Sequence, residues 1–373
     1  MLNVIWLFEY PTLNGGEHSL LATLPYLRAA RVRVSAVAPP EGPLARRLEQ
    51  LGVEFIPLRL ANELGAREPL PAARRKLAEA LASHRPDLLH ANSLSMGRFC
   101  GPLARELRLP CVAHLRDIIG LSHAAIKDLN CNDRLLAVSA ATRDFHVDQG
   151  LEPGRAAVLH NGVDLDRFRP RPAQGKLRRE LGIGDEAVII GTIGQLVMRK
   201  GHDILAQAAA RLSGQAPRLA YVLIGERYST KPEAVEYEAR LRAGFAAFPE
   251  RTHFLGVRDD VDQMLREIDI LVHPARQEPL GRVLLEGAAA GKAIVATDVG
   301  GTREIFPPSA GAAILVPPND PAALADGIAK LAANARLRLQ LGIAARGRAV
   351  EGFDIATAAA GLLTHYREAA SRG

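Results

Sequence analysis

Short apolar segments alternate with longer amphipathic segments along most of this chain. The apolar segments are four to nine residues long, as buried strands are, and the stretches between them repeat their apolar residues at helical spacing. A regular alternation of strand and helix predicts βαβ units and parallel sheets. In the N-terminal part of the chain, strands are expected at 3–10, 33–39, 54–60, 87–93, 111–117, 134–140 and 156–162.

A second series of the same kind follows a polar stretch at 163–176, which is typical of a linker. We therefore expect two doubly wound α/β domains, at 1–165 and 166–350, with ligands bound at the carboxyl ends of their strands. A helical region at 351–373 is expected to pack back on the first domain. The strands of the second series are expected at 187–194, 218–226, 251–257, 269–275, 293–299 and 312–318.

Composition narrows the class of protein without identifying it. The chain has 373 residues, 48% of them hydrophobic, with a net charge of +6 and only 5% aromatic residues. The mild positive charge suits an anionic substrate, whereas the lack of basic stretches interleaved with aromatic residues argues against nucleic-acid binding. Three cysteines show neither CxxC nor metal-ligand spacing.

The expected location is cytoplasmic. The N-terminus has no basic segment typical of a signal peptide, and no apolar run approaches the roughly 20 residues that a membrane helix needs. Basic helices near 74–85 and 98–108 leave open a peripheral contact with the anionic inner face of a membrane, although a solvated basic surface is the simpler and preferred explanation.

The segment "ARQEPLGRVLLEGAAAG" holds two glutamates, Glu278 and Glu286, eight positions apart. Pro279 suits the first turn of a helix and Gly291 its C-terminal cap, so the carboxylates should lie roughly 12 Å apart along the helix axis. They could then hold the two ends of one elongated ligand, with phosphate at the helix N-terminus between them. An N-terminal dipole partner and a solvated helix glutamate are the structural alternatives.

Three further loops carry candidate chemistry at expected strand ends. Gly15 and Gly16 open the first helix and could expose backbone N–H groups to a phosphate. Arg199 and Lys200 are adjacent at the first loop of the second domain and could neutralise a diphosphate. His114 ends a strand of the first domain and could contact a substrate. A plain turn, a solvated pair and a core histidine are the corresponding structural alternatives.

Taken together and in order, six motifs resemble one family. They are "NGGEHSL", "HNGVD", "MRKGHDIL", "FLGVRDDV", "EPLGRVLLE" and "VATDVGGTREIF". The chain resembles the retaining glycosyltransferases of GT-B fold in sequence family 4, the group 1 transferases, from about residue 10 to about residue 306. The resemblance implies two Rossmann-like domains that face a central cleft, with a C-terminal helix packed back on the first domain.

The resemblance also implies roles for individual residues. It places Glu286 on the ribose, Glu278 on the donor sugar, Arg199 and Lys200 on the leaving diphosphate, and His114 near the transferred sugar or the acceptor. The implied catalytic residues are His114, Arg199, Lys200 and Glu278. The implied donor-binding residues are Gly15, Gly16, Gln195, Glu226, Val257, Arg258, Leu280, Gly281, Arg282 and Glu286, where loop 254–258 would take the base and the main chain at 15–16 and 280–281 the diphosphate.

One position departs from the family pattern. Gln195 stands where an arginine is usual, in "GQL" instead of "GRL", so one diphosphate-binding cation is missing and Arg199 would have to replace it.

The implied reaction moves a sugar from a nucleotide sugar, preferably a UDP sugar with a GDP sugar as the alternative, to a hydroxyl of a glycan, glycolipid or small molecule. It would retain the anomeric configuration through same-face attack and need neither metal nor another cofactor. An epimerase or phosphorylase of the same fold and a non-catalytic sugar-binding protein remain alternatives. The absence of a GxGxxG motif disfavours an NAD-dependent dehydrogenase.

Overall fold

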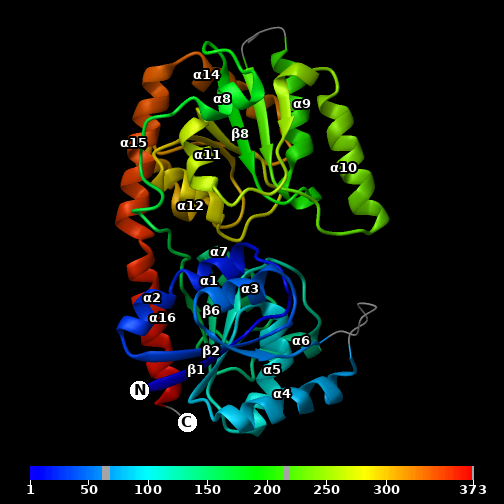
Figure 1. The fold of residues 1–373 in the computed structure, drawn as a ribbon, viewed down its shortest axis with the longest axis vertical. Helices are drawn as coiled ribbons and strands as arrows, with labels where there is room; N and C mark the ends of the chain where they lie inside the picture. The colour runs from blue at the N-terminus through cyan, green and yellow to red at the C-terminus, as the bar shows by residue number, and fades with distance from the viewer. Residues whose placement is uncertain (61–67, 214–218, 372–373) are drawn as a thin grey trace. The chain divides into compact units, whose positions relative to one another are not determined.

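The computed structural model describes residues 1–60, 68–213 and 219–371 of the chain (Figure 1). They belong to two compact units, one formed by Met1–Gly162 with Ile355–Gly373 and the other by Val163–Asp354. The first residue of the strand expected at 218–226 and the last two of the helical region expected at 351–373 lie outside the described residues. Each unit is described below by itself.

The first unit contains a parallel sheet in the order β3-β2-β1-β4-β5-β6-β7. Its strands are β1 (Leu2–Leu7), β2 (Val32–Ala38), β3 (Glu54–Pro57), β4 (Leu88–Ala91), β5 (Cys111–Leu115), β6 (Arg134–Ala137) and β7 (Ala156–Val158). The chain builds outward from β1 to β3 and then returns to the other side of β1 with β4. The topological switch point, where ligands bind in sheets of this kind, is therefore between β1 and β4.

Helices cover both faces of this sheet, and each face has its own apolar core. Three of the helices begin at serines, Ser93, Ser122 and Ser139, whose hydroxyls accept a hydrogen bond from an N–H of the first turn. The helices are α1 (Gly15–Leu21), α2 (Leu24–Ala29), α3 (Gly42–Gln50), α4 (Leu70–His84), α5 (Leu94–Glu106), α6 (His123–Leu129), α7 (Ala140–Val147) and α16 (Ile355–Ala370).

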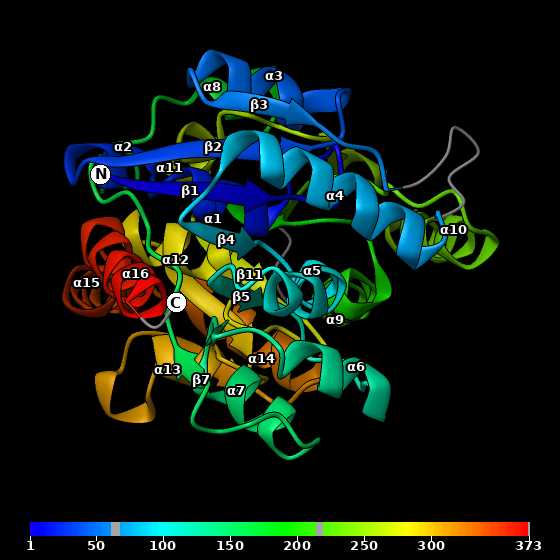
Figure 2. The ribbon, with the colours of Figure 1, turned by 90° about the horizontal axis from the view of Figure 1, so that it is seen from below.

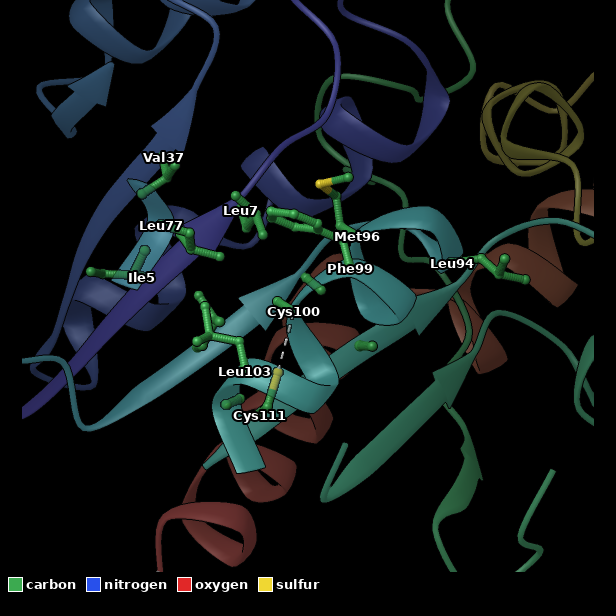
Figure 3. Close-up of a cluster of buried hydrophobic side chains, with 14 of the residues drawn as sticks. Ile5, Leu7, Val37, Leu77, Leu94, Met96, Phe99, Cys100, Leu103 and Cys111 are labelled. Atoms are coloured by element: carbon green, nitrogen blue, oxygen red, sulfur yellow. Dashed lines mark hydrogen bonds between the residues drawn. The ribbon is translucent and has the colours of Figure 1, made fainter. Parts of the chain in front are cut away.

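The core on one face includes two cysteines in contact. Figure 3 shows Cys100 of α5 and Cys111 of β5 among the aliphatic side chains of β1, α4 and α5, and their sulfur atoms lie 3.6 Å apart. Both are buried free thiols, and the contact with Cys100 together with burial raises the pKa of the Cys111 thiol. These groups are packing residues, since a protonated buried thiol is a poor nucleophile.

The last helix of the chain, α16, belongs to the first unit. It packs on α2 and on the neighbouring strands β4 and β5 (Figures 1 and 2). Its residues Leu362, Tyr366 and Ala369 are part of the core on that face of the sheet. The prediction that the C-terminal helix packs back on the first domain is therefore confirmed.

The second unit repeats the architecture with a parallel sheet in the order β10-β9-β8-β11-β12-β13. Its strands are β8 (Val188–Ile193), β9 (Leu219–Ile224), β10 (Thr252–Phe254), β11 (Ile270–His273), β12 (Ala293–Thr297) and β13 (Ile314–Val316). The helices are α8 (Lys176–Leu181), α9 (His202–Leu212), α10 (Pro232–Phe245), α11 (Val261–Glu267), α12 (Arg282–Ala289), α13 (Thr302–Ile305), α14 (Pro321–Ala332) and α15 (Ala335–Gly352), with 3₁₀ turns η1 (Met198–Lys200), η2 (Pro249–Arg251) and η3 (Pro308–Ala310). The switch point lies between β8 and β11, and the predicted doubly wound α/β class is confirmed in both units.

Helix α12 begins later than its sequence suggests. Pro279 is not in its first turn, because Gly281 caps the helix in the left-handed conformation with φ of 92° and Arg282 is the first helical residue. The expected end is correct: Gly291 has φ of 68°, and the N–H groups of Gly291 and Lys292 bond back into the last turn. Glu286 is consequently about one turn into the helix rather than two.

Candidate active site

Two loops that follow the switch-point strands of the second unit are joined through their main chains. The N–H of Arg276, in the loop after β11, donates to the carbonyl of Arg199, in the loop after β8, at 2.8 Å. Between them Gly201 has φ of 65°, and a Cβ at this position would lie 1.9 Å from the carbonyl oxygen of Pro274. A glycine is required here both for its backbone conformation and for the close approach of the two loops.

The side chain of Arg276 fixes the same junction. Its guanidinium makes a bidentate pair with Asp203, at 2.8 and 2.6 Å, and also donates to the carbonyl of Met198 at 2.8 Å. The hydroxyl of Tyr237 donates to the same carboxylate at 3.0 Å. A planar fork of this kind is geometrically specific, so the loop that carries Arg199 and Lys200 has one defined position on the β11 loop.

This junction brings together Lys200, Glu278 and His273. The Lys200 ammonium donates to Oε2 of Glu278, and Nε2 of His273 lies 2.7 Å from the same oxygen. The Glu278 side chain is only 7% exposed and that of Lys200 13%. Burial acts to raise the pKa of Glu278, but the Lys200 charge and the His273 hydrogen bond outweigh it and hold that pKa well below its usual range.

The charge state of the cluster follows from these contacts. Burial lowers the pKa of His273 despite its carboxylate partner, so the imidazole is neutral and donates from Nε2 to the anionic Glu278. Both partners contact Oε2. The second carboxylate oxygen, Oε1, is thus the one that can accept a hydrogen bond from a ligand hydroxyl.

Helix α12 carries the second predicted glutamate. Its N-cap residue, Gly281, has no side chain that could cap the first turn, and a helix N-terminus of this kind suits an anion. One turn further, the Glu286 carboxylate is buried and accepts from Arg282 at 2.7 Å. Burial raises the pKa of Glu286 in spite of that arginine. Two predicted donor-binding residues, Arg282 and Glu286, therefore form an ion pair with each other.

The remaining predicted residues of the second unit lie on adjoining loops. The carbonyl of Gln195, after β8, accepts from Nε2 of the buried His202 at 3.2 Å. The N–H of Leu196 donates to the carbonyl of Glu226, after β9, at 3.0 Å. The β8 and β9 loops are thus connected at the carboxyl edge of the sheet.

The β9 and β10 loops are joined in the same way. The N–H of Gly225 donates to the carbonyl of Gly256 at 2.7 Å, which places Val257 and Arg258 beside the β9 loop. Val257 is half exposed, whereas the Arg258 guanidinium makes a bidentate pair with Asp260 at 2.8 Å for both bonds. The main chain and Val257, rather than the Arg258 charge, are therefore the groups of this loop that are available to a base.

In the first unit, Gly15 and Gly16 open helix α1, as predicted. A Cβ on Gly16 would lie 2.9 Å from Cδ of Arg116, so the helix packs tightly over that arginine. The Arg116 guanidinium is held by Asn161, at 2.8 Å, and by the side chain and carbonyl of Asn92, at 3.0 and 3.1 Å. Burial lowers the pKa of Arg116 to about 10, which still leaves it charged at neutral pH.

His114 lies at the end of β5 beside this arginine. Both line a small cavity of about 20 Å³, together with Ser19, Thr23 and Asn161 among others. The His114 side chain is buried, and its Nδ1 is 2.8 Å from Nε2 of His90 on the adjacent strand β4. The predicted histidine is therefore part of a buried polar group at the switch point of the first sheet.

The sequence interpretation missed the residues that hold the predicted ones in place. His273 contacts Glu278, and His202 contacts Gln195. Arg276 contacts the loop that carries Arg199, and Arg116 packs under Gly16. A signal existed for His273, because it is the last residue of a buried strand, directly before Pro274, and strand ends carry the site in this architecture. The partners of His202 and Arg276 could not be inferred from local pattern.

Within residues 1–60, 68–213 and 219–371, no group of three or more His, Cys, Asp or Glu side chains is arranged to hold a metal ion. None of the helices in the described part of the chain has the length and apolar character needed to cross a membrane.

On the expected basic surface, Arg74 of α4 donates to the carbonyl of Phe99 at 2.9 Å and lies 3.8 Å from a carboxylate oxygen of Asp128.

Fold and sequence together define the class. The family model described as "Glycosyl transferases group 1" matches residues 173–348, and the one described as "Glycosyltransferase Family 4" matches residues 13–167. The two matches fall on the two units in the order that the motifs predict. The chain belongs to the group 1 glycosyltransferases and has the GT-B fold.

Particular relatives agree with this assignment. A D-inositol 3-phosphate glycosyltransferase of Streptomyces bingchenggensis is 29% identical over 343 residues, which are 82% of this chain and 73% of that protein. A GDP-mannose-dependent alpha-mannosyltransferase of Mycobacterium tuberculosis is 28% identical over 383 residues and covers 97% of this chain and 95% of its own.

Solved structures agree on the fold. Anabaena HepE, in complex with UDP and glucose, superposes with a TM-score of 0.86 at 23% identity and covers 98% of this chain and 99% of its own. Sucrose-phosphate synthase from Thermosynechococcus elongatus gives a TM-score of 0.83 at 20% identity and covers both chains completely.

Proposed function

We propose that this glycosyltransferase moves a sugar from a nucleoside diphosphate sugar, preferably a UDP sugar, to an acceptor hydroxyl with retention of configuration and without a metal. The observation that carries the proposal is the cluster of Lys200, Glu278 and His273 at the β8/β11 switch point, whose Glu278 lies in the loop that leads into the N-terminus of α12. A cation and a helix N-terminus suit a diphosphate, and carboxylates suit sugar hydroxyls.

In this proposal each group of the second unit has one task. Oε1 of Glu278 accepts a hydrogen bond from a hydroxyl of the donor sugar, and the Glu286 carboxylate accepts hydrogen bonds from the ribose hydroxyls. The amides of Leu280 and Gly281, with Lys200 and Arg199, stabilise the negative charge that grows on the diphosphate as its bond to the sugar breaks. Gly15 and Gly16 are proposed to contact the same diphosphate, Gln195 and Arg282 to line the donor site, and Glu226, Val257 and Arg258 to border the base.

The state of Glu278 supports same-face attack. A double displacement needs a carboxylate that is free to attack the anomeric carbon, as in retaining glycosidases. The Glu278 carboxylate is held by an ammonium and an imidazole, and its low pKa marks a stabilised anion and hence a weak nucleophile. We infer that the bond from sugar to diphosphate oxygen breaks with its electron pair going to the diphosphate. The acceptor oxygen then bonds the same carbon and passes its proton to the departing diphosphate.

The relatives supply the candidate substrates. The Mycobacterium tuberculosis relative is by its name GDP-mannose-dependent, so GDP-mannose must be tested beside the UDP sugars. The Streptomyces relative is named for D-inositol 3-phosphate, which is therefore one acceptor to test. Glycans and glycolipids are the other acceptor classes. Peripheral contact with an anionic membrane would suit a glycolipid acceptor and stays part of this proposal.

A ligand titration followed by product analysis tests the proposal. Melting temperatures are measured with UDP, GDP and ADP and with their glucose, N-acetylglucosamine and mannose conjugates, for the wild type and for Glu286→Gln. We expect stabilisation by one nucleotide and its conjugates, and a weaker response in Glu286→Gln. Transfer to an acceptor should then proceed in EDTA and give the donor's anomeric configuration by NMR.

Each contrary outcome rejects a different part of the proposal. An inverted product would reject retention, and loss of activity in EDTA with recovery on adding a divalent ion would reject metal independence. Conversion of the donor sugar without an acceptor would indicate an epimerase. Binding with no turnover of any donor and acceptor pair would favour a sugar-binding protein.

A further inference from the structure

A continuous chain of buried hydrogen bonds runs through the first unit and ends at His114. The indole Nε1 of Trp6, on β1, lies 3.0 Å from the hydroxyl of Tyr366, on α16. That hydroxyl is hydrogen-bonded to Nδ1 of His90, on β4, and Nε2 of His90 lies 2.8 Å from Nδ1 of His114, on β5. Trp6, His90 and Tyr366 are fully buried and His114 is 4% exposed, so this series of hydrogen bonds comes nearest to the surface at His114.

One direction of donation follows if the buried hydroxyl hydrogen of Tyr366 is to have a partner. The indole N–H of Trp6 can donate but cannot accept, so the Tyr366 oxygen accepts from it. The Tyr366 hydrogen then has Nδ1 of His90 as its acceptor, because Trp6 offers none. A neutral His90 that accepts at Nδ1 carries its hydrogen on Nε2 and donates to Nδ1 of His114. A neutral His114 that accepts at Nδ1 carries its own hydrogen on Nε2.

The surroundings keep both histidines neutral, as this argument requires. Burial is the main cause that lowers the pKa of His90 and of His114, and the positive charge of the buried Arg116 adds to it in both cases. The neighbouring His365 contributes in the same direction for His114. Both imidazoles accordingly stay in the neutral form, in which a tautomer is defined.

We propose that Tyr366 and His90 are positioning residues that hold His114 in the Nε2–H tautomer, so that it presents a hydrogen-bond donor to a sugar oxygen. The inference rests on the proposed function, which places His114 at the transferred sugar or the acceptor. It deepens that function in one respect: His114 acts as a donor that orients a hydroxyl or ring oxygen, and it is not the base that takes the acceptor's proton. The C-terminal helix, which carries Tyr366, thereby sets the tautomer of His114.

Long-range ¹H–¹⁵N NMR of ¹⁵N-histidine-labelled full-length protein reads the tautomer directly. The His114 signals are assigned by their loss in His114→Gln. Wild type should show a pyrrole-type Nε2 and a pyridine-type Nδ1 for His114. Two matched variants then separate the roles, since Tyr366→Phe and Trp6→Phe both remove the Trp6–Tyr366 bond, but only Tyr366→Phe removes the donor to His90.

We expect Trp6→Phe to keep the His114 tautomer and Tyr366→Phe to shift it toward Nδ1–H or a mixture. Equal shifts in both variants would indicate simple repacking and would overturn the proposal, as would an unchanged tautomer in Tyr366→Phe. If Tyr366→Phe does not fold, the pair His90→Gln and His90→Leu gives the same test. The glutamine retains an amide donor for His114 Nδ1 and the leucine does not, so only His90→Leu should lose the Nε2–H form.

Kinetics give the second readout. A lost hydrogen bond to a neutral oxygen should lower kcat/KM for sugar transfer by about 3- to 10-fold in Tyr366→Phe. A purely structural role of Tyr366 predicts an unchanged KM for the donor in Tyr366→Phe. That result, together with an unchanged kcat, would contradict the proposal. The NMR measurement needs no substrate, so a tautomer that responds as expected in a protein without transferase activity would reject the proposed function and the donation to a sugar, and would leave only the assignment of the His114 tautomer standing.

Discussion

Replacing Lys200 by methionine tests the central cluster of the second unit. The substitution keeps most of the apolar stem and removes the ammonium group from Oε2 of Glu278. The Glu278 carboxylate is only 7% exposed, and among the described residues its remaining hydrogen-bond partner is His273, at 2.7 Å. A buried carboxylate that loses its cation must remain as an unpaired charge, take up a proton, or draw a proton onto the neighbouring imidazole.

The magnitude follows from the burial of the pair. Removing one partner of a buried ion pair costs about 3–5 kcal/mol, and 1 kcal/mol shifts the melting temperature of a domain of this size by about 2–4 °C. We therefore expect Lys200→Met to melt about 6–20 °C below wild type at pH 8. The Lys200 charge is one of the causes that lower the pKa of His273, so the variant should also raise that pKa.

The pH dependence has a definite sign. In Lys200→Met the folded pKa of His273 should exceed its unfolded value of about 6.5, so its stabilising contribution is complete below that pH and is lost as the pH rises through the folded pKa. In wild type, burial lowers the pKa of His273, so this group destabilises the fold as the pH falls below about 6.5. On acidification the variant gains stability and the wild type loses it, so the difference between their melting temperatures becomes smaller.

Calorimetry of the full chain at pH 8 and pH 5.5 provides the assay, with two controls. Lys292→Met removes a half-buried lysine that donates to two main-chain carbonyls, at 3.1 and 3.2 Å, and should give a difference independent of pH. Arg199→Met removes the adjacent exposed cation and should change stability by no more than about 0.5 kcal/mol. A Lys200→Met difference below about 2 °C at pH 8, or one that widens at pH 5.5, would refute the reasoning.

Two other substitutions test single features of the second unit. Gly201→Ala should destabilise the fold by at least about 2 kcal/mol in melting experiments, because its Cβ would lie 1.9 Å from the carbonyl oxygen of Pro274 and the φ of residue 201 is positive. The control is Gly184→Ala, which has open space around the added Cβ and should be nearly neutral. Glu286→Gln should weaken binding of the nucleoside diphosphate by about 10-fold or more in calorimetric titration. Since burial raises the pKa of Glu286, the same change should cost little stability, and a large loss of stability without a change in Kd would make this glutamate a structural residue.

The fold was predictable because its signals are local. Each strand is a short apolar run followed by a helical pattern, and right-handed crossovers restrict how such units assemble into a parallel sheet. What failed was the start of α12. Pro279 is a reasonable first helical residue by itself, but the left-handed Gly281 delays the helix to Arg282. That conformation depends on the packing around Gly281, including Glu278 and Leu284, which no local pattern encodes.

The site was predictable only in part. Strand ends identified Lys200 and Glu278 as residues of one edge of the sheet, yet the sequence assigned them to different parts of a ligand. That they bond to each other depends on the docking of two loops 78 residues apart, through Arg276 and the close approach at Gly201. Long-range docking of this kind has no signature in hydrophobic period or motif spacing, and the same holds for the partners of His114.

The pairing of Lys200 bears directly on the missing cation at Gln195. In the structure the positive charge of Lys200 is balanced by Glu278, with His273 neutral, so these three groups carry no net charge. In the proposed function, Arg199, which is exposed, and the N-terminus of α12 would then offer positive charge to an incoming diphosphate. A sugar hydroxyl that donates to Glu278 would weaken its hold on Lys200 and release that charge toward the diphosphate only when the sugar is in place. On this argument the loss of an arginine at 195 is tolerable for binding the whole nucleotide sugar and unfavourable for binding the free nucleotide.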